Sequence, residues 1–460
     1  MWIKIDMIDL EANIIYLPTA IAKTITEVAF VCFGKNKVLA KVKVMEDAAV
    51  TDVHSFNNPM TIKISKELVN ELLIVESLTY QLVLDKGNIV IGPVIALLLG
   101  NRSHLYNPYY MKKYSDRLGV YSKFGGLIYG FSCKGVDWDN NVVYGLYYDN
   151  EKSQWRYGKF PFPTVIYRRN FHVSERLIKK LINVTDGRLF NSTRFTKYEL
   201  YKFVEKNKYL SNYLIPTELS VNESVIKNFL KEYKKVILKP IDLSRGRGIC
   251  VIEEKQRGYK VLDYRNTEYI EKYLDDDESL EIFLKSNRSF FQKYLVQKHL
   301  ELAMIDGSCF DVRVVMQKDR NKVWICTGIE CRVAKKDSLI TNISRGGYAL
   351  PLSVALTKAF PDESNQKLLM QQLDNLCKKF CNHMDQMGEH FAEFGLDVAV
   401  DINKNLWLIE ANVLPSFKGF KRMDYNNYLN IRYTPLIYAV SLTEFYESVS
   451  LEGDKDKSDF

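Results

Sequence analysis

The segment GLDVAVDINKNLWLIEAN, at residues 395–412, constrains the fold more than any other part of the chain. Two stretches in which polar and apolar residues alternate flank an Asn-Lys pair at 403–404, which is suited to a tight reversal, and this pattern predicts an antiparallel β-hairpin. In the register set by that reversal, Asp397 stands opposite Glu410. Asn412 follows two residues after Glu410 and points from the same face of its strand. We therefore expect three side-chain oxygen donors to converge.

These oxygen donors predict a site for a divalent cation. Like charges directly across an antiparallel pair cost up to about 1 kcal/mol, and more when they are desolvated, unless a cation lies between them. Hard oxygen ligands select Mg²⁺ or Mn²⁺. The alternative is a solvated hairpin whose acids face water. Against that alternative, Leu408 and Ile409 make the second strand apolar beside this face and favour its burial.

A second segment, VILKPIDLSRGRGICVIE at residues 236–253, has the composition of a phosphate-binding loop. A β-branched strand ends at Lys239, and Ser244, Gly246 and Gly248 follow before another strand begins. Glycines let backbone N–H groups approach an anion closely, and the lysine adds a positive charge beside them. The ending of a Walker A motif is absent from this segment, and Gly-rich hairpins that bind nothing are common, so the segment alone leaves both interpretations open.

Arginines recur at three places further along the chain. Arg313 follows Asp311 by two residues, Arg332 lies on a later strand, and Arg345 belongs to a Ser-Arg-Gly-Gly run. Guanidinium groups on strands that lead into an acidic site are suited to neutralising a substrate carboxylate or phosphate. The alternative for each single arginine is an ordinary surface ion pair.

Length, charge and hydropathy exclude several classes of protein. The 460 residues, 47% hydrophobic, are enough for a large core and more than one domain. The net charge of +8 is not gathered into a long basic run, so we expect no nucleic acid as partner. Apolar runs are far shorter than the roughly 20 residues of a membrane-spanning helix, so we expect no membrane partner. The 8 scattered cysteines and the lack of a signal segment favour a cytoplasmic location.

Changes of pattern along the chain predict three folded domains and a tail. Residues 1–88 have the short strands of a small, barrel-like β-rich domain, and residues 89–189 alternate strands with helices in the manner of an α/β domain. Residues 190–448 mix strands with amphipathic helices, one of which, at 367–390, has an apolar stripe that predicts core. Residues 449–460 have the composition of a disordered tail.

Taken in order, the motifs resemble the ATP-grasp superfamily of carboxylate–amine ligases over roughly residues 190–440. Their order is also similar to that in the ribosomal-protein-type glutamate ligases. Over nearly the whole length, the chain resembles the YheC/YheD-type family of endospore coat-associated ATP-grasp proteins. The narrower likeness is carried by GPVIALL at 92–98, Gly125-Gly126, FPFPTVIYRR at 160–169 and FNSTRFTKY at 190–198.

The resemblance implies a mixed α+β and α/β architecture. Two α+β lobes of an ATP-grasp fold, at residues 190–300 and 301–448, would grip ATP between them. The first of these lobes would cover the nucleotide, and the second would carry the metal and the catalytic groups. A pre-ATP-grasp α/β layer and the small β-rich domain would precede them.

The resemblance also implies roles for individual residues. ATP would be bound by Lys197, Lys239, Ser244, Gly246, Gly248, Gln297, Lys298, His299, Asp311 and Asn342. Lys197 and Lys239 would contact the phosphates, backbone groups around residues 297–299 would meet the adenine edge, and Asp311 would lie on the ribose side. Mg²⁺ or Mn²⁺ would be held by Asp397, Glu410 and Asn412. The acyl phosphate and the acid substrate would face Arg313, Arg332 and Arg345.

The function implied by the resemblance is an ATP- and Mg²⁺-dependent ligase that joins a carboxylate to an amine through an acyl phosphate. Its substrates would be small molecules or peptides, and spore coat proteins would be further partners. The expected location is the cytoplasm or the surface of a forming spore. The alternative left open is a catalytically inert, nucleotide-binding structural protein of the spore coat. A nucleic-acid binder ranks third, since no basic stripe with interleaved aromatic residues is visible.

Overall fold

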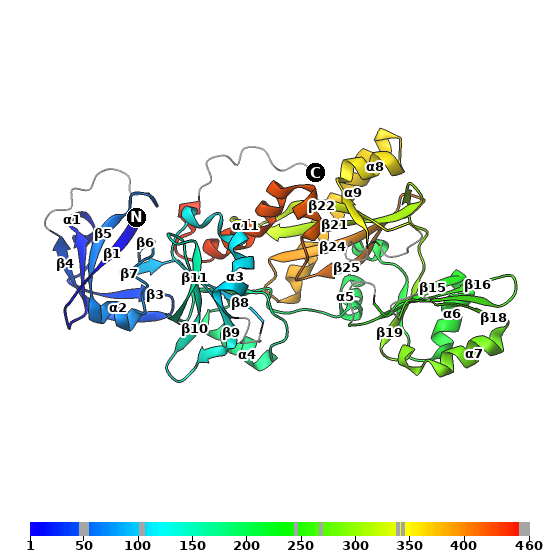
Figure 1. Cartoon of the computed structure of the whole chain (residues 1–460), viewed down its shortest axis with the longest axis horizontal. Helices are drawn as coiled ribbons and strands as arrows, with labels where there is room; N and C mark the ends of the chain where they lie inside the picture. The colour runs from blue at the N-terminus through cyan, green and yellow to red at the C-terminus, as the bar shows by residue number, and fades with distance from the viewer. Residues whose placement is uncertain are drawn as a thin grey trace.

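The computed structural model describes residues 1–45, 55–100, 106–242, 247–265, 270–336, 341 and 346–449. Four β-sheets are spaced along the long axis of the molecule, with the N-terminal barrel at one end (Figure 1). The sheet formed last in the chain lies between the second and the third, so the chain passes outward and then returns (Figure 1). The predicted domain boundaries remain a prediction.

The first sheet is a closed barrel with the strand order β1-β5-β2-β4-β3-β7-β6, which confirms the small β-rich unit. Alternate residues such as Val31 and Phe33 fill its interior, while Val28 and Phe30 face outward, as period-2 patterning requires. The elements are β1 (Trp2–Ile8), β2 (Ile14–Pro18), α1 (Thr19–Ala22), β3 (Val28–Phe33), β4 (Asn36–Met45), β5 (Met60–Ser65), α2 (Lys66–Leu72), β6 (Tyr80–Asp85) and β7 (Asn88–Gly92).

The second sheet has the order β11-β10-β9-β8-β12-β13. The strands β8, β9, β12 and β13 run parallel, as the α/β pattern predicts, whereas β10 and β11 add an antiparallel edge. Its elements are β8 (Val94–Leu98), α3 (Pro108–Met111), η2 (Lys112–Leu118), η3 (Tyr121–Lys123), β9 (Leu127–Asp137), β10 (Val142–Asp149), β11 (Gln154–Pro161), β12 (Val165–Arg168), α4 (Glu175–Val184) and β13 (Leu189–Phe190).

The third sheet is antiparallel, with the order β14-β19-β15-β16-β17-β18, and the helices α6 and α7 pack on it. The helix α5 begins at Lys197, directly after the capping residue Thr196, whose side chain accepts a hydrogen bond from the backbone N–H of Glu199. The elements are α5 (Lys197–Val204), η4 (Leu210–Tyr213), β14 (Thr217–Leu219), α6 (Glu223–Tyr233), β15 (Lys235–Pro240), β16 (Cys250–Glu254), β17 (Tyr259–Asp263), β18 (Ile270–Leu274), α7 (Asp277–Ser286), η5 (Arg288–Phe290) and β19 (Tyr294–Lys298).

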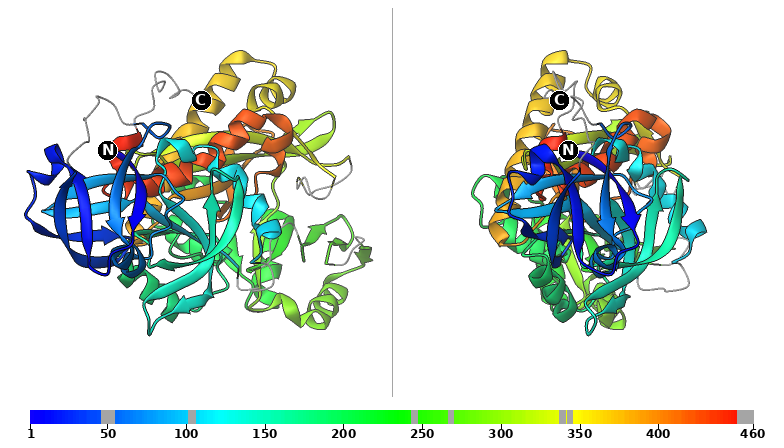
Figure 2. Two further views of the ribbon diagram at one scale, coloured as in Figure 1. Left: turned by 60° about the vertical axis from the view of Figure 1, so that its left-hand side comes forward. Right: turned by 90° about the vertical axis from the view of Figure 1, so that its left-hand side faces the viewer.

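The fourth sheet has the order β23-β22-β21-β24-β25, with β20 paired to β21. The helices α8 and α9 form an outer layer over it (Figure 2). The elements are β20 (Met304–Ile305), β21 (Ser308–Lys318), β22 (Trp324–Val333), β23 (Tyr348–Leu350), α8 (Leu352–Ala359), α9 (Glu363–Met384), η7 (Asp385–Met387), β24 (Glu393–Val400), β25 (Leu406–Asn412), α10 (Lys418–Met423), α11 (Tyr425–Ser441) and η8 (Tyr446–Val449).

The two faces of the fourth sheet differ in a way that creates the site. One face, with residues such as Val314 and Leu396, packs on the predicted apolar stripe of α9, which includes Leu373 and Phe380. The opposite face packs against α10 and α11 through Val315 and its neighbours. Beyond that cover, the same face carries charged side chains, so it is open to a ligand rather than to another layer of the protein.

The predicted hairpin is formed by β24 and β25, and Asp397 pairs with Glu410 as expected. The reversal itself is longer than the two residues predicted, because Val400 pairs with Leu406. The carboxylate of Asp401 accepts hydrogen bonds from the backbone N–H groups of Asn403 and Asn405, both at 2.9 Å, and so organises a wider turn. A register shift between Asp397 and Val398 then restores the predicted pairing.

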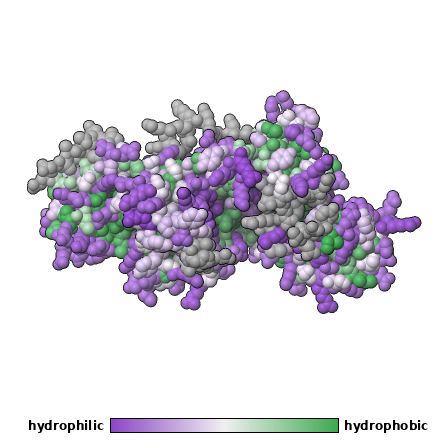
Figure 3. All heavy atoms as spheres, in the orientation of Figure 1, coloured by the Kyte–Doolittle hydropathy of each residue, from purple (hydrophilic) through white to green (hydrophobic). Residues whose placement is uncertain are grey.

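On the face of the molecule drawn in Figure 3, hydrophilic residues predominate and apolar residues form small, separate patches. Such scattered apolar residues are normal for a surface that faces water. Among the described residues, no helix is both long enough and apolar enough to cross a lipid bilayer.

Candidate functional site

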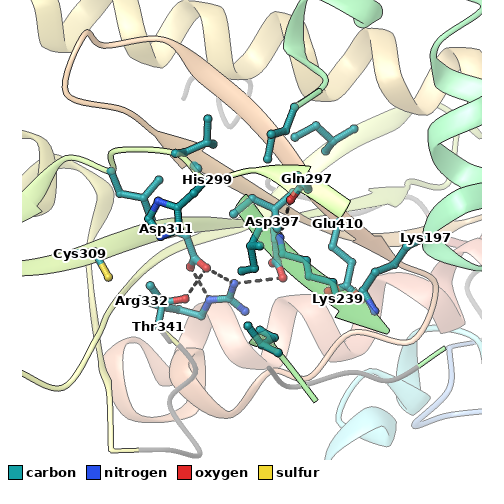
Figure 4. Close-up of a pocket in the computed structure, with 18 of the residues that line it drawn as sticks. Lys197, Lys239, Gln297, His299, Cys309, Asp311, Arg332, Thr341, Asp397 and Glu410 are labelled. Carbon is teal, nitrogen blue, oxygen red and sulfur yellow. Dashed lines mark hydrogen bonds and ion pairs between the residues drawn. The ribbon is translucent and has the colours of Figure 1, made fainter. Parts of the chain in front are cut away.

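A cavity of about 740 Å³ lies between the third and the fourth sheet, within the range of roughly 300–1,000 Å³ that is usual for ligand sites. The strands β15 and β19 line one side, and β21, β22, β24 and β25 line the other (Figure 4). The predicted residues that line it are Lys197, Lys239, Gln297, Lys298, His299, Asp311, Arg313, Arg332, Asp397, Glu410 and Asn412. The structure thus brings together most of the predicted site.

The remaining predicted residues belong to two segments of the sequence, 244–248 and 342–345. Gly248 has a φ of 76°, a left-handed conformation that favours glycine, and its neighbours Arg247 and Ile249 line the cavity. Four predicted residues lie outside the described residues: Ser244, Gly246, Asn342 and Arg345. The predicted tail also falls, from residue 450 on, outside them.

Four strands of the fourth sheet place charged side chains side by side on the cavity face. Across β22, β21, β24 and β25, the successive cross-strand partners are Glu330, Arg313, Asp397 and Glu410, which we call the charged row. Two residues along, Arg332 on β22 pairs with Asp311 on β21. Because residues two apart share a face of a strand, all of these side chains point to the same side of the sheet.

The two arginines form ion pairs with two buried aspartates. Arg313 donates to both oxygens of Asp397, and its Nη2 lies 2.9 Å from Oδ2. Arg332 donates to Asp311 through two contacts of 2.7 Å, and its Nη2 also lies 3.1 Å from Oδ2 of Asp397. Thr341 donates its hydroxyl to Asp311. We call this end of the cavity the arginine end (Figure 4).

At the arginine end, burial and ion pairing shift the pKa values of the side chains in opposite directions, and the effect of ion pairing is the larger. Burial alone would raise the pKa of Asp397, but Arg313 and Arg332 hold it below its usual value. Likewise, burial would lower the pKa of Arg332, but Asp311 and Asp397 raise it well above the ordinary value. The positive charges of both guanidinium groups are therefore balanced by carboxylates of the same chain. Their predicted contact with the acyl phosphate and the acid substrate, and that of Asp311 with the ribose, stay predictions.

Two lysines from different elements meet at the opposite end of the cavity, which we call the lysine end. Lys197 opens α5, and its ammonium donates to the carbonyl of Pro240 at 3.3 Å. Lys239, on β15, donates to Oε1 of Gln297 at 2.6 Å, and Gln297 in turn donates to the hydroxyl of Thr217 at 2.7 Å. Lys239 is thus bonded to a neutral amide. Its pKa is lowered to about 8, first by burial and then by the nearby charge of Lys197.

Glu410 faces the lysine end from the fourth sheet (Figure 4). Burial raises the pKa of its carboxyl, and Asp397 raises it further, whereas Lys197 lowers it. A divalent cation would offset this cost, since it favours the charged form of the carboxyl. The chemistry of the acid and its surroundings therefore fits a bound cation.

The three predicted metal ligands fit Mg²⁺ unequally. Glu410 and Asn412 line the cavity from one strand, two residues apart. Both oxygens of Asp397 already accept hydrogen bonds from Arg313, so this carboxylate would reach a metal only through its remaining lone pairs. Among the described residues, no three His, Cys, Asp or Glu side chains cluster in a way that could hold a metal ion, so an amide such as Asn412 must complete the set.

The segment predicted to meet the adenine is also placed at the cavity. The backbone N–H groups of Lys298 and His299 donate to the carbonyls of Pro216 and Lys235, at 3.0 and 3.1 Å. Burial lowers the pKa of His299 to about 4, so its imidazole is neutral at pH 7. Its Nδ1 is buried and has no hydrogen-bond partner among the described residues. The N–H groups of Lys298 and His299 are therefore already bonded within the protein, and the predicted contact of residues 297–299 with the adenine stays a prediction.

Sequence reasoning missed Glu330, a buried carboxyl in the charged row. A signal was present, because Glu330-Cys331-Arg332 repeats the acid-x-Arg spacing of Asp311-Val312-Arg313. On antiparallel strands, two such triplets place each arginine opposite the acid of the other strand. Gly395 was also missed: a Cβ there would lie 2.5 Å from the Cβ of Pro415, so only glycine lets that proline close over the site.

Comparison with known proteins agrees with the geometry. The model of a family described as "YheC/D like ATP-grasp" matches residues 186–442. The chain is 25% identical over 369 residues to the endospore coat-associated protein YheD of Bacillus subtilis (strain 168), which covers 77% of this chain and 80% of the relative. It is 22% identical over 311 residues to the endospore coat-associated protein YheC of the same organism, which covers 65% of this chain and 84% of the relative.

Among solved structures, D-alanyl-alanine synthetase A from Vibrio cholerae O1 biovar eltor str. N16961 is 12% identical. The match covers 77% of this chain and 98% of that one, with a TM-score of 0.42, which is too low to carry an argument. The family match does not depend on this structural similarity. It spans more than half of the chain and both walls of the cavity. The prediction of an ATP-grasp fold is confirmed, and the chain belongs to the YheC/D-like ATP-grasp family.

Proposed function

We propose that the chain is an ATP- and Mg²⁺-dependent ligase that joins a carboxylate to an amine through an acyl phosphate. One observation carries the proposal: Lys197 and Lys239 line the same cavity as Glu410 and Asn412. Cations suited to a triphosphate and oxygen donors suited to its metal ion thus meet in a space of ligand size. Membership of an ATP-grasp family supports ATP as the nucleotide.

The lysine end holds the phosphates of ATP. Lys239 exchanges a neutral partner, Gln297, for an anionic one, so the attraction between opposite charges in a buried site is added to its hydrogen bond. By the family resemblance, the loop with Ser244, Gly246 and Gly248 covers the phosphates. Glu410 and Asn412, with the remaining lone pairs of Asp397, hold the Mg²⁺ or Mn²⁺. When bound, this ion offsets charge on the transferred phosphoryl group.

The arginine end receives the acid substrate. A carboxylate is a poor electrophile, so its oxygen first attacks the γ-phosphorus of ATP, and ADP leaves with the electrons of the broken P–O bond. An amine then attacks the carbonyl carbon, the C–O bond to the phosphate breaks, and inorganic phosphate leaves with a proton from the nitrogen. Arg313 and Arg332, held in place by their aspartates, orient the acid and stabilise charge as it develops, which costs little reorganisation. By the resemblance, Arg345 is the third such group and Asn342 contacts the nucleotide.

The proposal also covers the substrates of the ligase and its location at the spore surface. The two Bacillus subtilis relatives are named endospore coat-associated, which supports a carboxylate or amine of the spore surface, free or within a peptide. The same names favour a second candidate function, a nucleotide-binding structural protein of the coat without turnover.

Two measurements separate these functions. Isothermal titration calorimetry with ATP and Mg²⁺ tests nucleotide binding, which both functions require. Incubation with ATP, Mg²⁺ and a pool of the amino acids and dipeptides then tests turnover. The ligase predicts ADP only when an acceptor is present and a new amide in the mass spectrum. Binding with flat ADP would favour the structural role, and no binding would exclude both.

Glu410→Gln is the variant that tests the metal-binding side of the cavity. It keeps the shape of the side chain and removes the charge, so we expect turnover to fall at least about a hundredfold, which corresponds to the loss of one strong electrostatic contact. Glu363→Gln, at the exposed start of α9, is the matched control and should keep full turnover. Equal rates for the two variants would contradict the assignment of Glu410.

A further inference from the structure

Glu330 is a buried carboxyl that the proposed ligase reaction does not yet use. It lies on β22, is only 2% exposed, and lines the cavity at the arginine end. Its Oε2 is buried and has no hydrogen-bond partner among the described residues. Buried polar atoms are nearly always bonded in folded proteins, so this oxygen requires an explanation.

The register of the sheet explains why Glu330 forms no ion pair with Arg313, its cross-strand neighbour. Arg313 stands between two carboxylates, Glu330 on β22 and Asp397 on β24. It makes both of its contacts to Asp397. The neighbouring Arg332 is occupied by Asp311 and Asp397. Among the described residues, two guanidinium groups therefore face three carboxyl groups, and Glu330 is the one without an ion-pair partner.

The surroundings of Glu330 leave it ready for a cation. Burial raises its pKa to about 7, although Arg313 and Arg332 pull it down, and Asp397 and Asp311 raise it further. These four side chains are the charged groups that face it from β21, β22 and β24. An unpaired carboxyl in such a place is costly to keep, and a positively charged ligand would repay its burial.

We propose that Glu330 binds the protonated amino group of the acceptor substrate. The inference rests on the proposed ligase function and extends it, because it names the acceptor class: a primary amine that is cationic when it binds, such as the α-amino group of an amino acid or peptide. In this position the amine lies beside Arg313 and Arg332, where the acid substrate is activated, and it gives up one proton to the Glu330 carboxylate before its nitrogen attacks. The two reacting groups are thus held next to each other before attack.

Glu330→Gln tests the proposal, since it keeps the size of the side chain and removes its charge. ATP, Mg²⁺ and the pool of amino acids and dipeptides are supplied, and amide products are measured by mass spectrometry. In parallel, the pool is offered with hydroxylamine, which is mostly neutral at pH 7 and traps an acyl phosphate as a hydroxamate. We expect Glu330→Gln to raise the KM for the amine at least tenfold, with hydroxamate formation and ATP affinity within twofold of the wild type.

The outcomes separate failure of this inference from failure of the ligase function. If the wild-type protein makes neither amide nor hydroxamate, the ligase function falls and this inference with it. If the wild type makes both and Glu330→Gln leaves the KM for the amine unchanged, the inference alone is overturned. If Glu330→Gln loses amide and hydroxamate together, Glu330 acts on the acyl phosphate or on the fold, which also overturns it.

Two further variants guard against a trivial result. Glu330→Asp keeps the charge and should recover most of the amine affinity, whereas a purely structural role predicts that the shorter side chain does no better than Gln. Glu363→Gln removes an exposed carboxyl and should leave the KM for the amine unchanged. Thermal melting of each variant shows that the folded proteins are compared.

Discussion

The two ends of the cavity hold their cations in opposite states. At the arginine end, Arg313 and Arg332 are neutralised by buried aspartates through contacts of 2.7–2.9 Å. At the lysine end, Lys239 is bonded to the neutral Gln297, beside a second ammonium. The arginines of the first end are thus paired with carboxylates before any ligand arrives, whereas Lys239 at the second end has no carboxylate partner among the described residues. An incoming triphosphate therefore gains most at the lysine end.

This difference also separates stability from binding. A buried ion pair holds the protein together because removing one partner leaves the other charge stranded. A buried ammonium without a carboxylate weakens the fold and is repaid only when an anion binds. Substitutions at the two ends should therefore affect different measurements.

The largest effect is expected for Asp397→Asn at the arginine end. The substitution strands the charges of Arg313 and Arg332, so the free energy of unfolding should fall by about 3 kcal/mol in urea denaturation. The control is Glu254→Gln, which breaks an ion pair to Lys234 whose side chain is 64% exposed, and should cost at most about 0.5 kcal/mol. A loss below about 1 kcal/mol for Asp397→Asn would show that Glu330 can replace Asp397 as the partner of Arg313.

Lys239→Met should have the opposite profile. We expect its free energy of unfolding to equal or exceed that of the wild type, because a buried charge beside Lys197 is removed. ATP–Mg²⁺ affinity should fall about thirtyfold to a hundredfold in calorimetry, in line with the loss of about 2–3 kcal/mol from a hydrogen bond to a charged group. Lys234→Met, an exposed substitution, should change neither quantity. A destabilised Lys239→Met would break the contrast between the two ends.

The sequence predicted the position of Lys239 and the pairing of Asp397 with Glu410 better than the ion pairs of the arginine end. Lys239 ends a β-branched strand, and Asp397 faces Glu410 across one hairpin, so both follow from local patterns. The ion pair between Arg313 and Asp397 depends on β21 lying beside β24, although 84 residues separate the two side chains. Local periodicity carries no information about that neighbour. Glu330 was missed for the same reason. That Arg313 pairs with Asp397 rather than with Glu330 becomes apparent only from the arrangement of β22, β21 and β24.

The predicted length of the hairpin turn was wrong for a related reason. The Asn-Lys pair at 403–404 predicted a two-residue turn, but the carboxylate of Asp401 binds two backbone N–H groups and widens it. Side-chain bonds to the backbone compete with turn propensity, and pair statistics do not include them. The prediction of Asp397 opposite Glu410 survives because the register shift on β25 compensates.

A pH titration tests the contrast between the two ends through the protonation of one group, the ammonium of Lys239. Because the pKa of Lys239 is lowered to about 8, its ammonium is progressively lost above that pH in the free protein. ATP binds the protonated form, so affinity should fall by up to about tenfold per pH unit above pH 8. Over the same window the unfolded chain binds more protons than the folded one, so the free energy of unfolding should rise with pH. Lys239→Met should flatten both trends; a wild-type affinity that is constant to pH 9.5 would contradict this account.

The smallest effect is expected for Gln297→Glu, which makes the lysine end resemble the arginine end. A carboxylate 2.6 Å from the ammonium would neutralise Lys239 and raise its pKa, as Asp311 does for Arg332. The gain in stability should be small, on the order of 1 kcal/mol, because Thr217 must turn its hydroxyl from Ile215 to the new carboxylate. ATP affinity should fall about fivefold, since the phosphates now compete with an internal anion, and the decline of affinity above pH 8 should move to higher pH. Tighter ATP binding in this variant would mean that the charge of Lys239 is not what the phosphates recognise.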